Sequence, residues 1–294
     1  MIIDTHAHIH TDGIEPGMKA RFSPESYWRT RGEVDMAIII GMMFKSINFE
    51  IPNESIAALV DADPKRLAGF CSLYPDDPDA PNKLRHCVRD LGLIGLKLSP
   101  TFQSFYPNDP KCFPLYKACV ELAIPVAFHT GSSLMSRPAR IIYGDVKLID
   151  EVAQEFPDLR IIVCHIGYSQ YTDTIDLMKK QPNVYADCSI CHLAGLGQDG
   201  HGQKPSVHYP YFHWVRPLLY NFCTMGDQDK LLLGTEYPSA SGKNIVDALM
   251  ALPGMMEKMG LPPIPQEKID NIISENWKRL FKLTGQGRLV PALW

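Results

Sequence analysis

The stretch Met1-Ile-Ile-Asp-Thr-His-Ala-His-Ile-His10 joins a short apolar run to alternating histidines. The apolar run predicts a β-strand, in which residues two apart face the same side, so Asp4, His6 and His8 are expected to project together. Two imidazoles on one side of a strand can hold one divalent metal ion, and a nearby carboxylate can orient an imidazole. The stretch therefore predicts a metal site at the end of the first strand, with Asp4 as the orienting carboxylate.

The same kind of apolar strand recurs along the chain, separated by helical sequence. Met36–Gly41 is apolar on both faces, which is typical of a parallel strand that is buried on both sides. Six further strands are predicted at Leu67–Leu73, Ile94–Ser99, Pro125–His129, Arg160–His165, Val184–Cys188 and Lys230–Glu236. Eight strand and helix units predict an α/β protein with the (β/α)₈ TIM-barrel fold rather than a doubly wound sheet.

The helical segments complete this pattern. They are predicted at Pro24–Gly32 with Ser23 as its cap, Pro52–Ala62, Pro81–Leu91, Pro110–Leu122, Val146–Phe156, Tyr171–Lys180 and, last in the chain, Gln266–Leu283. No linker or repeat divides the sequence, so residues 1–294 are expected to form a single barrel domain. Residues 195–209, which hold four glycines, are interpreted as a lid over the mouth of the barrel.

Composition narrows the class of partner. The chain has 294 residues, of which 45% are hydrophobic, and its formal net charge of −4 offers no basic field for nucleic acid or an anionic membrane. No apolar run approaches the ~20 residues of a membrane span, and no leader pattern precedes the first strand. We therefore expect a cytoplasmic protein with a small-molecule substrate, no nucleic-acid partner and no membrane partner.

In a TIM barrel the carboxyl ends of the strands meet in one mouth, which holds the active site. A single histidine there can simply cap a strand, but the joint placement of several chemically active side chains at strand ends indicates a site. These side chains are His6 and His8 on the first strand, Lys97 on the fourth, His129 on the fifth, His165 on the sixth and Glu236 on the eighth.

Three cations follow strand ends closely enough to overlook the mouth. Lys97, Arg137 and Arg140 are predicted to bind a carboxylate of the substrate, because guanidinium groups in particular match carboxylates in shape and charge. The alternative is that Arg137 and Arg140 are solvated loop charges or pair with Asp145.

Six fragments of the sequence also carry a resemblance to a known family. They are Ile3-Asp-Thr-His-Ala-His8, Gly95-Leu-Lys-Leu-Ser-Pro100, Phe105-Tyr-Pro107, Phe128-His-Thr-Gly131, Cys164-His-Ile-Gly167 and Leu232-Leu-Gly-Thr-Glu-Tyr-Pro238. In order and spacing they resemble the amidohydrolase superfamily, in the amidohydrolase-related branch that includes aminocarboxymuconate semialdehyde decarboxylase. The resemblance covers nearly the whole chain, and it also implies that the barrel pairs as a homodimer.

The resemblance implies roles for particular residues. His6, His8 and His129 would be ligands of one divalent metal, His165 would hydrogen-bond the water on that metal, and Glu236 would be the last acidic ligand or a base. The family usually has Asp at this last position, so Glu236 is expected to bind in a different mode, to select a different metal or to act as a base beside it. We expect one ion per chain, Zn²⁺ first and Mn²⁺ second.

This ligand set implies a reaction in two variants. A water activated by the metal would attack an ester, lactone or amide of a carboxylate-bearing substrate, with His165 or Glu236 handling the proton, and this hydrolysis is the first interpretation. The close alternative is non-oxidative decarboxylation of an aromatic or unsaturated carboxylic acid. A non-catalytic or metal-free barrel is the remaining alternative, which only the unusual Glu236 favours.

Overall fold

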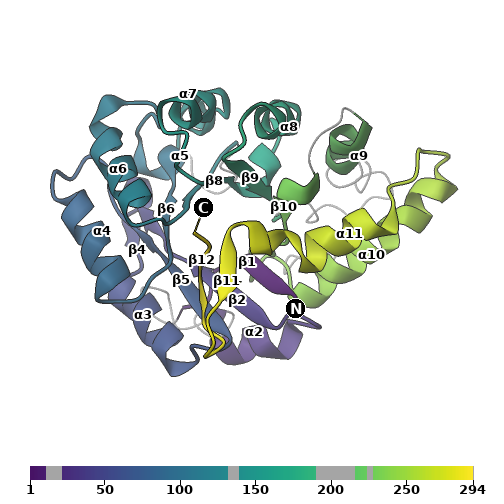
Figure 1. The fold of residues 1–294 in the computed structure, drawn as a ribbon, viewed down its shortest axis with the longest axis horizontal. Helices are drawn as coiled ribbons and strands as arrows, with labels where there is room; N and C mark the ends of the chain where they lie inside the picture. The colour runs from purple at the N-terminus through teal and green to yellow at the C-terminus, as the bar shows by residue number, and fades with distance from the viewer. Residues whose placement is uncertain (11–21, 132–138, 190–215, 224–227, 294) are drawn as a thin grey trace.

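The computed structural model contains eight parallel strands in one sheet that curls into a barrel (Figure 1). The structure describes residues 1–10, 22–131, 139–189, 216–223 and 228–293. Around the sheet the strands are β1 (Ile3–Ala7), β2 (Met36–Ile40), β5 (Leu67–Ser72), β6 (Gly95–Leu98), β7 (Val126–Phe128), β8 (Ile161–Val163), β9 (Val184–Asp187) and β10 (Leu231–Leu232). The predicted (β/α)₈ barrel is confirmed, with all eight strands at the expected places.

Both faces of the strands are buried, as their apolar sequences require. Along β2, Met36 and Ile38 pack inside the barrel, whereas Ala37 and Ile39 belong to the layer between the sheet and the helices. Residues of a strand point alternately to its two faces, so a strand such as β2 contributes to both clusters. The sheet is therefore held from inside by barrel-filling side chains and from outside by the helices.

Helices surround the sheet, and most of them begin within a few residues of the predicted positions (Figure 1). The Ser23 side chain accepts a hydrogen bond from the Ser26 N–H and so caps the first helix as predicted. The helices are α2 (Pro24–Thr30), α3 (Asn53–Ala62), α4 (Ala80–Arg89), α5 (Pro100–Gln103), α6 (Phe113–Glu121), α7 (Lys147–Glu155), α8 (Tyr171–Lys180), α9 (Arg216–Cys223), α10 (Gly242–Lys258) and α11 (Gln266–Ser274). None of the helices in the described ranges is long and apolar enough to span a membrane.

The predicted final helix at Gln266–Leu283 is wrong in its second half. Helix α11 ends at Ser274, and a 3₁₀ turn then leads to β11 (Phe281–Leu283), which pairs antiparallel with β12 (Leu289–Pro291). Phe281 packs with the side chains that fill the inside of the barrel. Burial of Phe281 in the barrel thus decides the structure of the segment after Ser274. The local sequence pattern, which is helical, does not reveal this burial.

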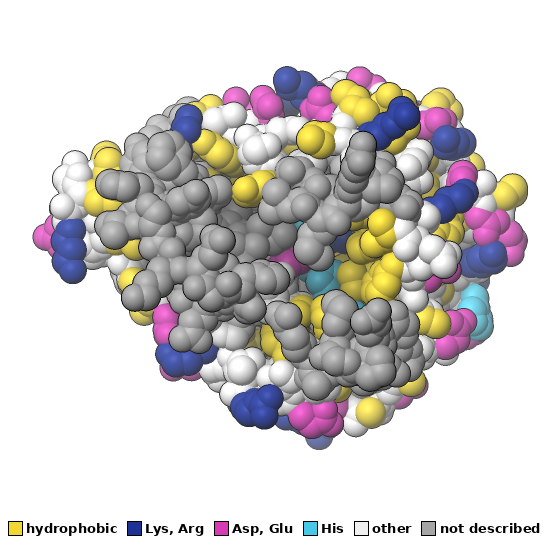
Figure 2. Space-filling model, turned by 180° about the vertical axis from the view of Figure 1, so that it is seen from behind, with side chains coloured by type: hydrophobic (Ala, Val, Ile, Leu, Met, Phe, Trp, Pro, Cys, Tyr) yellow, Lys and Arg dark blue, Asp and Glu magenta, His cyan; other side chains and the backbone are white. Residues whose placement is uncertain are grey.

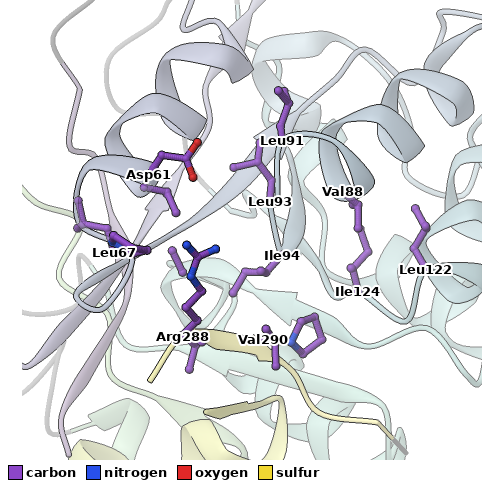
Figure 3. A pocket seen from close by; sticks show the side chains of 16 residues that line it. Asp61, Leu67, Val88, Leu91, Leu93, Ile94, Leu122, Ile124, Arg288 and Val290 are labelled. Atoms are coloured by element: carbon purple, nitrogen blue, oxygen red, sulfur yellow. The ribbon is translucent and has the colours of Figure 1, made fainter. Parts of the chain in front are cut away.

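An apolar pocket of about 320 Å³ lies beside this C-terminal hairpin (Figure 3). Its walls come from residues before or at the start of β5 and β6, including Leu67 and Ile94, and from Val290 of β12. Asp61 and Arg288 are its charged side chains. The pocket is therefore at the amino ends of the strands, the opposite end from the mouth, and it contains none of the predicted site residues.

The barrel closes between β1 and the segment that follows β10. The Glu236 N–H donates to the His6 carbonyl (2.8 Å), and the His8 N–H donates to the Tyr237 carbonyl (2.9 Å). Ala7 and Tyr237 form a parallel bridge between the same two segments. Backbone bonding thus fixes Glu236 directly against the histidines of β1.

Asp4 stabilises this closure and does not orient an imidazole, which corrects the prediction. Its carboxylate is fully buried and accepts hydrogen bonds from the N–H groups of His6 (3.1 Å) and Thr235 (3.0 Å), and from the hydroxyls of Thr235 (2.6 Å) and Tyr27 (2.8 Å). The register of β1 against β2 shifts between Asp4 and Ala7, so simple alternation fails there. The Asp4 side chain consequently contacts Tyr27 of helix α2 and Thr235 of the segment after β10, whereas the His6 side chain lies in the mouth of the barrel.

We expect Thr235→Val to destabilise the protein in a pH-dependent way. Burial raises the pKa of Asp4 from 3.8 to about 6, so ionisation of Asp4 already costs stability as the pH rises through this window. Removing a hydroxyl that donates to the carboxylate increases that cost. The free energy of unfolding in urea should fall by about 2 kcal/mol at pH 8 and by less at pH 5, where Asp4 is protonated in the folded protein.

The control is Thr172→Val on α8, which should change the free energy of unfolding by less than about 0.5 kcal/mol at either pH. An equal deficit for Thr235→Val at the two pH values would contradict the role given to Asp4.

Candidate metal centre

Three of the four predicted metal ligands converge in the mouth of the barrel. The ligand atoms of His6, His8 and Glu236 all lie within 4.8 Å of one another. His6, Asp187 and His165 form a second such group. On the face shown in Figure 2, histidine and acidic side chains lie at the centre beside hydrophobic side chains.

Hydrogen bonds hold the rings of His6 in β1 and of His8 directly after β1. His6 Nδ1 lies 2.8 Å from Asp187 Oδ2, and His8 Nδ1 lies 3.2 Å from the Ile40 carbonyl oxygen. A carbonyl or an ionised carboxylate only accepts, so Nδ1 of a neutral His6 donates and its Nε2 keeps a lone pair, the form in which histidine binds a metal. Both ring nitrogens of His8 face acceptors, because its Nε2 also lies 3.2 Å from Glu236 Oε1, so this ring requires a second cation, a proton or a metal ion, at Nε2.

The Glu236 carboxylate lies against both of these Nε2 atoms. Its Oε2 is 2.7 Å from His6 Nε2, and its Oε1 is 3.2 Å from His8 Nε2. The close contact with His6 is not aligned as a hydrogen bond, because both atoms are buried without a hydrogen-bond partner. Two acceptors this close repel one another unless a cation lies between them, so the donor set fits a divalent metal.

The charges of the site lead to the same conclusion. Burial raises the pKa of Glu236, but attraction to His6, His8 and His165 outweighs this and holds the pKa well below its usual range. Burial and Lys97 lower the pKa of His6, yet the carboxylates of Glu236 and Asp187 raise it well above its usual value. The two carboxylates thus create a strong local demand for positive charge, which a metal ion satisfies.

His129 and His165 form a second pair beside this group. His165 Nε2 lies 3.2 Å from His129 Nδ1, and His129 belongs to neither of the groups whose ligand atoms all lie within 4.8 Å. Burial lowers the pKa of His165 to about 4, and burial together with His165 and Lys97 lowers the pKa of His129 well below its usual value. Both rings are consequently neutral at pH 7.

Two backbone features position these side chains. His165 and Glu236 both adopt the left-handed conformation, with φ of 63° and 57°, which is uncommon for residues other than glycine and often accompanies a functional site. A Cβ atom at Gly234 would lie 3.1 Å from the His6 Cβ and 3.3 Å from the Ser189 Cβ. Glycine at this position therefore allows the closing segment to approach the site.

Of the three cations predicted to bind the substrate, Lys97 is buried in the barrel and Arg140 is exposed at the surface. Lys97 lies within β6 rather than in a loop, and its buried Nζ is 2.9 Å from Cys164 Sγ. Arg140 is exposed and precedes the 3₁₀ turn Ile141–Gly144. Arg137 and the predicted lid at 195–209 lie outside the described residues.

The sequence interpretation missed Asp187 and Ser189, which lie at the carboxyl end of β9. Asp187 Oδ1 accepts hydrogen bonds from the N–H of His165 (3.0 Å) and the N–H of Ser189 (3.1 Å), and Ser189 Oγ lies 2.6 Å from His165 Nδ1. The rule that strand ends meet at the mouth applies to Asp187 as well. It would have found this residue had carboxylates been considered on every strand.

Aromatic side chains form one wall beside His129. Phe102 is buried, and its ring lies edge-on to the His129 ring with 5.3 Å between centroids. Phe44 of the hairpin strand β3 (Met43–Phe44) stacks on Phe102 at 4.3 Å. Such a wall suits a planar ligand, because aromatic faces pack well against flat unsaturated groups.

A family model described as Amidohydrolase matches residues 3–283. The chain is 28% identical over 176 residues to the 2-keto-4-carboxy-3-hexenedioate hydratase of Sphingobium sp. (strain NBRC 103272 / SYK-6), which covers 49% of this chain and 51% of that protein. It is 24% identical over 220 residues to the 2-amino-3-carboxymuconate-6-semialdehyde decarboxylase of Dictyostelium discoideum, over 67% of this chain and 58% of that protein. The chain thus spans little more than half the length of these curated relatives.

Solved structures share the fold. A dihydroxybenzoic acid decarboxylase from Polaromonas sp. JS666, with bound manganese and the inhibitor 2-nitroresorcinol, superposes with a TM-score of 0.65 at 15% identity. The superposition covers 94% of this chain and 95% of that chain. At this level of identity the likeness establishes the barrel architecture alone.

We expect Asp187→Asn to weaken metal binding without abolishing it. The amide can no longer hold His6 with a charged acceptor, and loss of such a supporting contact typically costs about 10- to 100-fold in metal affinity. Competition with a chelator measures the change. The exposed control Asp90→Asn should bind metal like the unaltered protein, and an unchanged affinity for Asp187→Asn would contradict the role given to Asp187.

Proposed function

This protein belongs to the amidohydrolase family, and from that premise we propose that it is a metal-dependent enzyme that decarboxylates a small, planar, unsaturated or aromatic carboxylic acid. The observation that carries the proposal is the cluster of His6, His8 and Glu236, in which the carboxylate lies 2.7 Å from His6 Nε2 and 3.2 Å from His8 Nε2. Sequence reasoning put hydrolysis first. The names of two curated relatives favour decarboxylation, and the buried Lys97 favours a carboxylate-bearing substrate in either reaction.

The metal would be held by His6, His8 and Glu236, with His129 as the fourth predicted ligand. Mixed nitrogen and oxygen ligands suit Zn²⁺, and Mn²⁺ is the second choice because the Polaromonas structure contains manganese. When bound, the ion would act as a Lewis acid towards oxygen atoms of the substrate and would acidify water. The longer side chain of Glu236, compared with the usual Asp, reaches the imidazoles of both His6 and His8.

Lys97 supports an acidic substrate. Its side chain is buried and has no ion-pair partner among the described residues. Its charge lowers the pKa values of His6, His129 and His165, so the ammonium group acts on the whole site. A buried cation is costly unless an anion pairs with it, and a substrate carboxylate would provide that anion. Arg140 and Arg137 remain predicted contacts at the rim.

His165 and His129 support the proton transfer that decarboxylation needs. When the bond between the substrate carbon and its carboxylate breaks, CO₂ leaves, the electron pair stays on the carbon and a proton must be delivered there. His165 Nε2 lies 3.2 Å from Nδ1 of His129, a predicted metal ligand, so His165 is beside the metal site, where it would take a proton from water and hand it to that carbon. The aromatic wall of Phe102 and Phe44 would hold the unsaturated part of the substrate beside them.

Hydrolysis of an ester or lactone is the second candidate. Glu236 Oε2 is buried without a hydrogen-bond partner, so the carboxylate is available to take a proton from an attacking water. The hydratase relative also acts with water as a reactant, as its name states. The homodimer and the cytoplasmic location remain predictions.

A matched panel of substrates separates the two reactions. Protein loaded with Zn²⁺ or Mn²⁺ is incubated with aromatic and unsaturated carboxylic acids, and in parallel with esters and lactones of the same acids. We expect CO₂ release, with deuterium on the vacated carbon when the solvent is D₂O. Free acid formed from the esters would favour hydrolysis instead, and no turnover of either series would contradict both.

We expect Lys97→Met to raise KM for the accepted acid by about 10- to 100-fold, the magnitude of a lost hydrogen bond to a charged group. KM for a neutral analogue should change little. Lys278→Met, on the exposed surface, is the matched control and should leave both values unchanged. Equal effects of Lys97→Met on acid and neutral compounds would remove Lys97 from substrate binding.

A further inference from the structure

A chain of hydrogen bonds runs from β9 through two histidines of the mouth. Its members are Asp187, Ser189, His165 and His129, which come from three different strand ends. Ser189 is fully buried, and its Oγ lies 2.6 Å from His165 Nδ1. None of these bonds uses the atoms with which His6 and Glu236 face each other.

The direction of each bond follows from its acceptor end. The Asp187 carboxylate accepts from two backbone N–H groups, and the Ser189 hydroxyl also donates to its Oδ1 in a close contact. With its hydrogen used in this way, Ser189 Oγ can only accept from His165, so His165 carries its proton on Nδ1. The Nε2 of a neutral His165 is then an acceptor.

The same logic continues to His129. His165 Nε2 lies 3.2 Å from His129 Nδ1, so the Nδ1 of His129 must be the donor of that bond. A neutral His129 then has a bare lone pair on Nε2. This atom is buried and has no hydrogen-bond partner within the described part of the chain. Such an atom is costly to leave unused, which indicates that it faces a ligand.

We propose that Ser189 is a positioning residue, which fixes His165 and through it His129 in the Nδ1–H form and thereby keeps the Nε2 lone pair of His129 available for the metal. This inference rests on the metal centre of the proposed function. Without the Ser189 hydroxyl, His165 can move its proton to Nε2 and donate to His129 Nδ1. His129 would then carry its proton on Nε2, which blocks that atom as a ligand.

Nuclear magnetic resonance of the metal-free protein labelled with ¹⁵N-histidine tests this directly, because it reports which ring nitrogen carries the proton. We expect Nδ1–H for both His129 and His165 in the unaltered protein, with signals assigned by their loss in His129→Gln and His165→Gln. In Ser189→Ala, a population of His129 with Nε2–H should appear. Zn²⁺ affinity, measured by chelator competition, should fall about 10- to 100-fold.

Two further variants separate positioning from general stability. Ser99→Ala removes another buried serine hydroxyl, one that has no hydrogen-bond partner within the described residues, and should alter neither readout. Ser189→Thr keeps the hydroxyl and should restore the Nδ1–H form.

The possible results distinguish this inference from the proposed function. Nε2–H on His129 in the unaltered protein, or an unchanged His129 in Ser189→Ala, would overturn the inference. Correct tautomers in a protein that binds no metal would overturn the proposed function and leave the hydrogen-bond chain intact. If Ser189→Ala does not fold, the spectrum of the unaltered protein still decides the direction of the chain.

Discussion

The closure of the barrel is the constraint on which the site depends. The Glu236 N–H binds the His6 carbonyl at 2.8 Å, and the buried Asp4 carboxylate binds both the N–H and the hydroxyl of Thr235, the residue before Glu236. These bonds join the first strand to the segment after the last one. They place the Glu236 carboxylate against the imidazoles of His6 and His8, residues that are more than two hundred positions away in the sequence.

The buried charges of the mouth then determine its chemistry. Asp187 and Glu236 flank His6, and Lys97 lies near enough to act on three imidazoles. Opposite charges this deep in a protein are stable only when each finds a partner. A divalent metal between the histidines and Glu236, together with a substrate carboxylate near Lys97, would give every one of these groups a partner. The proposed metal-dependent reaction of a carboxylic acid rests on this arrangement.

Sequence reasoning predicted the fold well because burial on both faces gives parallel strands a plain signal. The eight apolar runs, such as Met36–Gly41, are strands in the structure. Helix α10 (Gly242–Lys258) was not predicted, since Pro253 and Gly254 interrupt its pattern. The predicted final helix extends past the observed end of α11 at Ser274. The hairpin that follows α11 is held by contacts of Phe281 and Leu289 inside the barrel, which local helical propensity does not reveal.

The site was predictable to the level of strand ends and no further. His6, His8 and Glu236 meet as the barrel requires, whereas the register shift in β1 turns Asp4 away from the imidazoles. Asp187 takes the position beside His6 that the alternation of β1 had given to Asp4. The tautomers of the histidines depend on distances between three strands, which no sequence pattern encodes.

Metal content of the protein purified without chelator or added metal tests the central claim most directly, with Glu236→Gln and the exposed control Glu257→Gln measured beside it. The account predicts about one zinc or manganese ion per chain in the unaltered protein and the control, and a large loss in Glu236→Gln, because the amide cannot supply the negative charge that faces both imidazoles. Protein that is metal-free and takes up no zinc on titration would contradict it, and so would full metal content in Glu236→Gln.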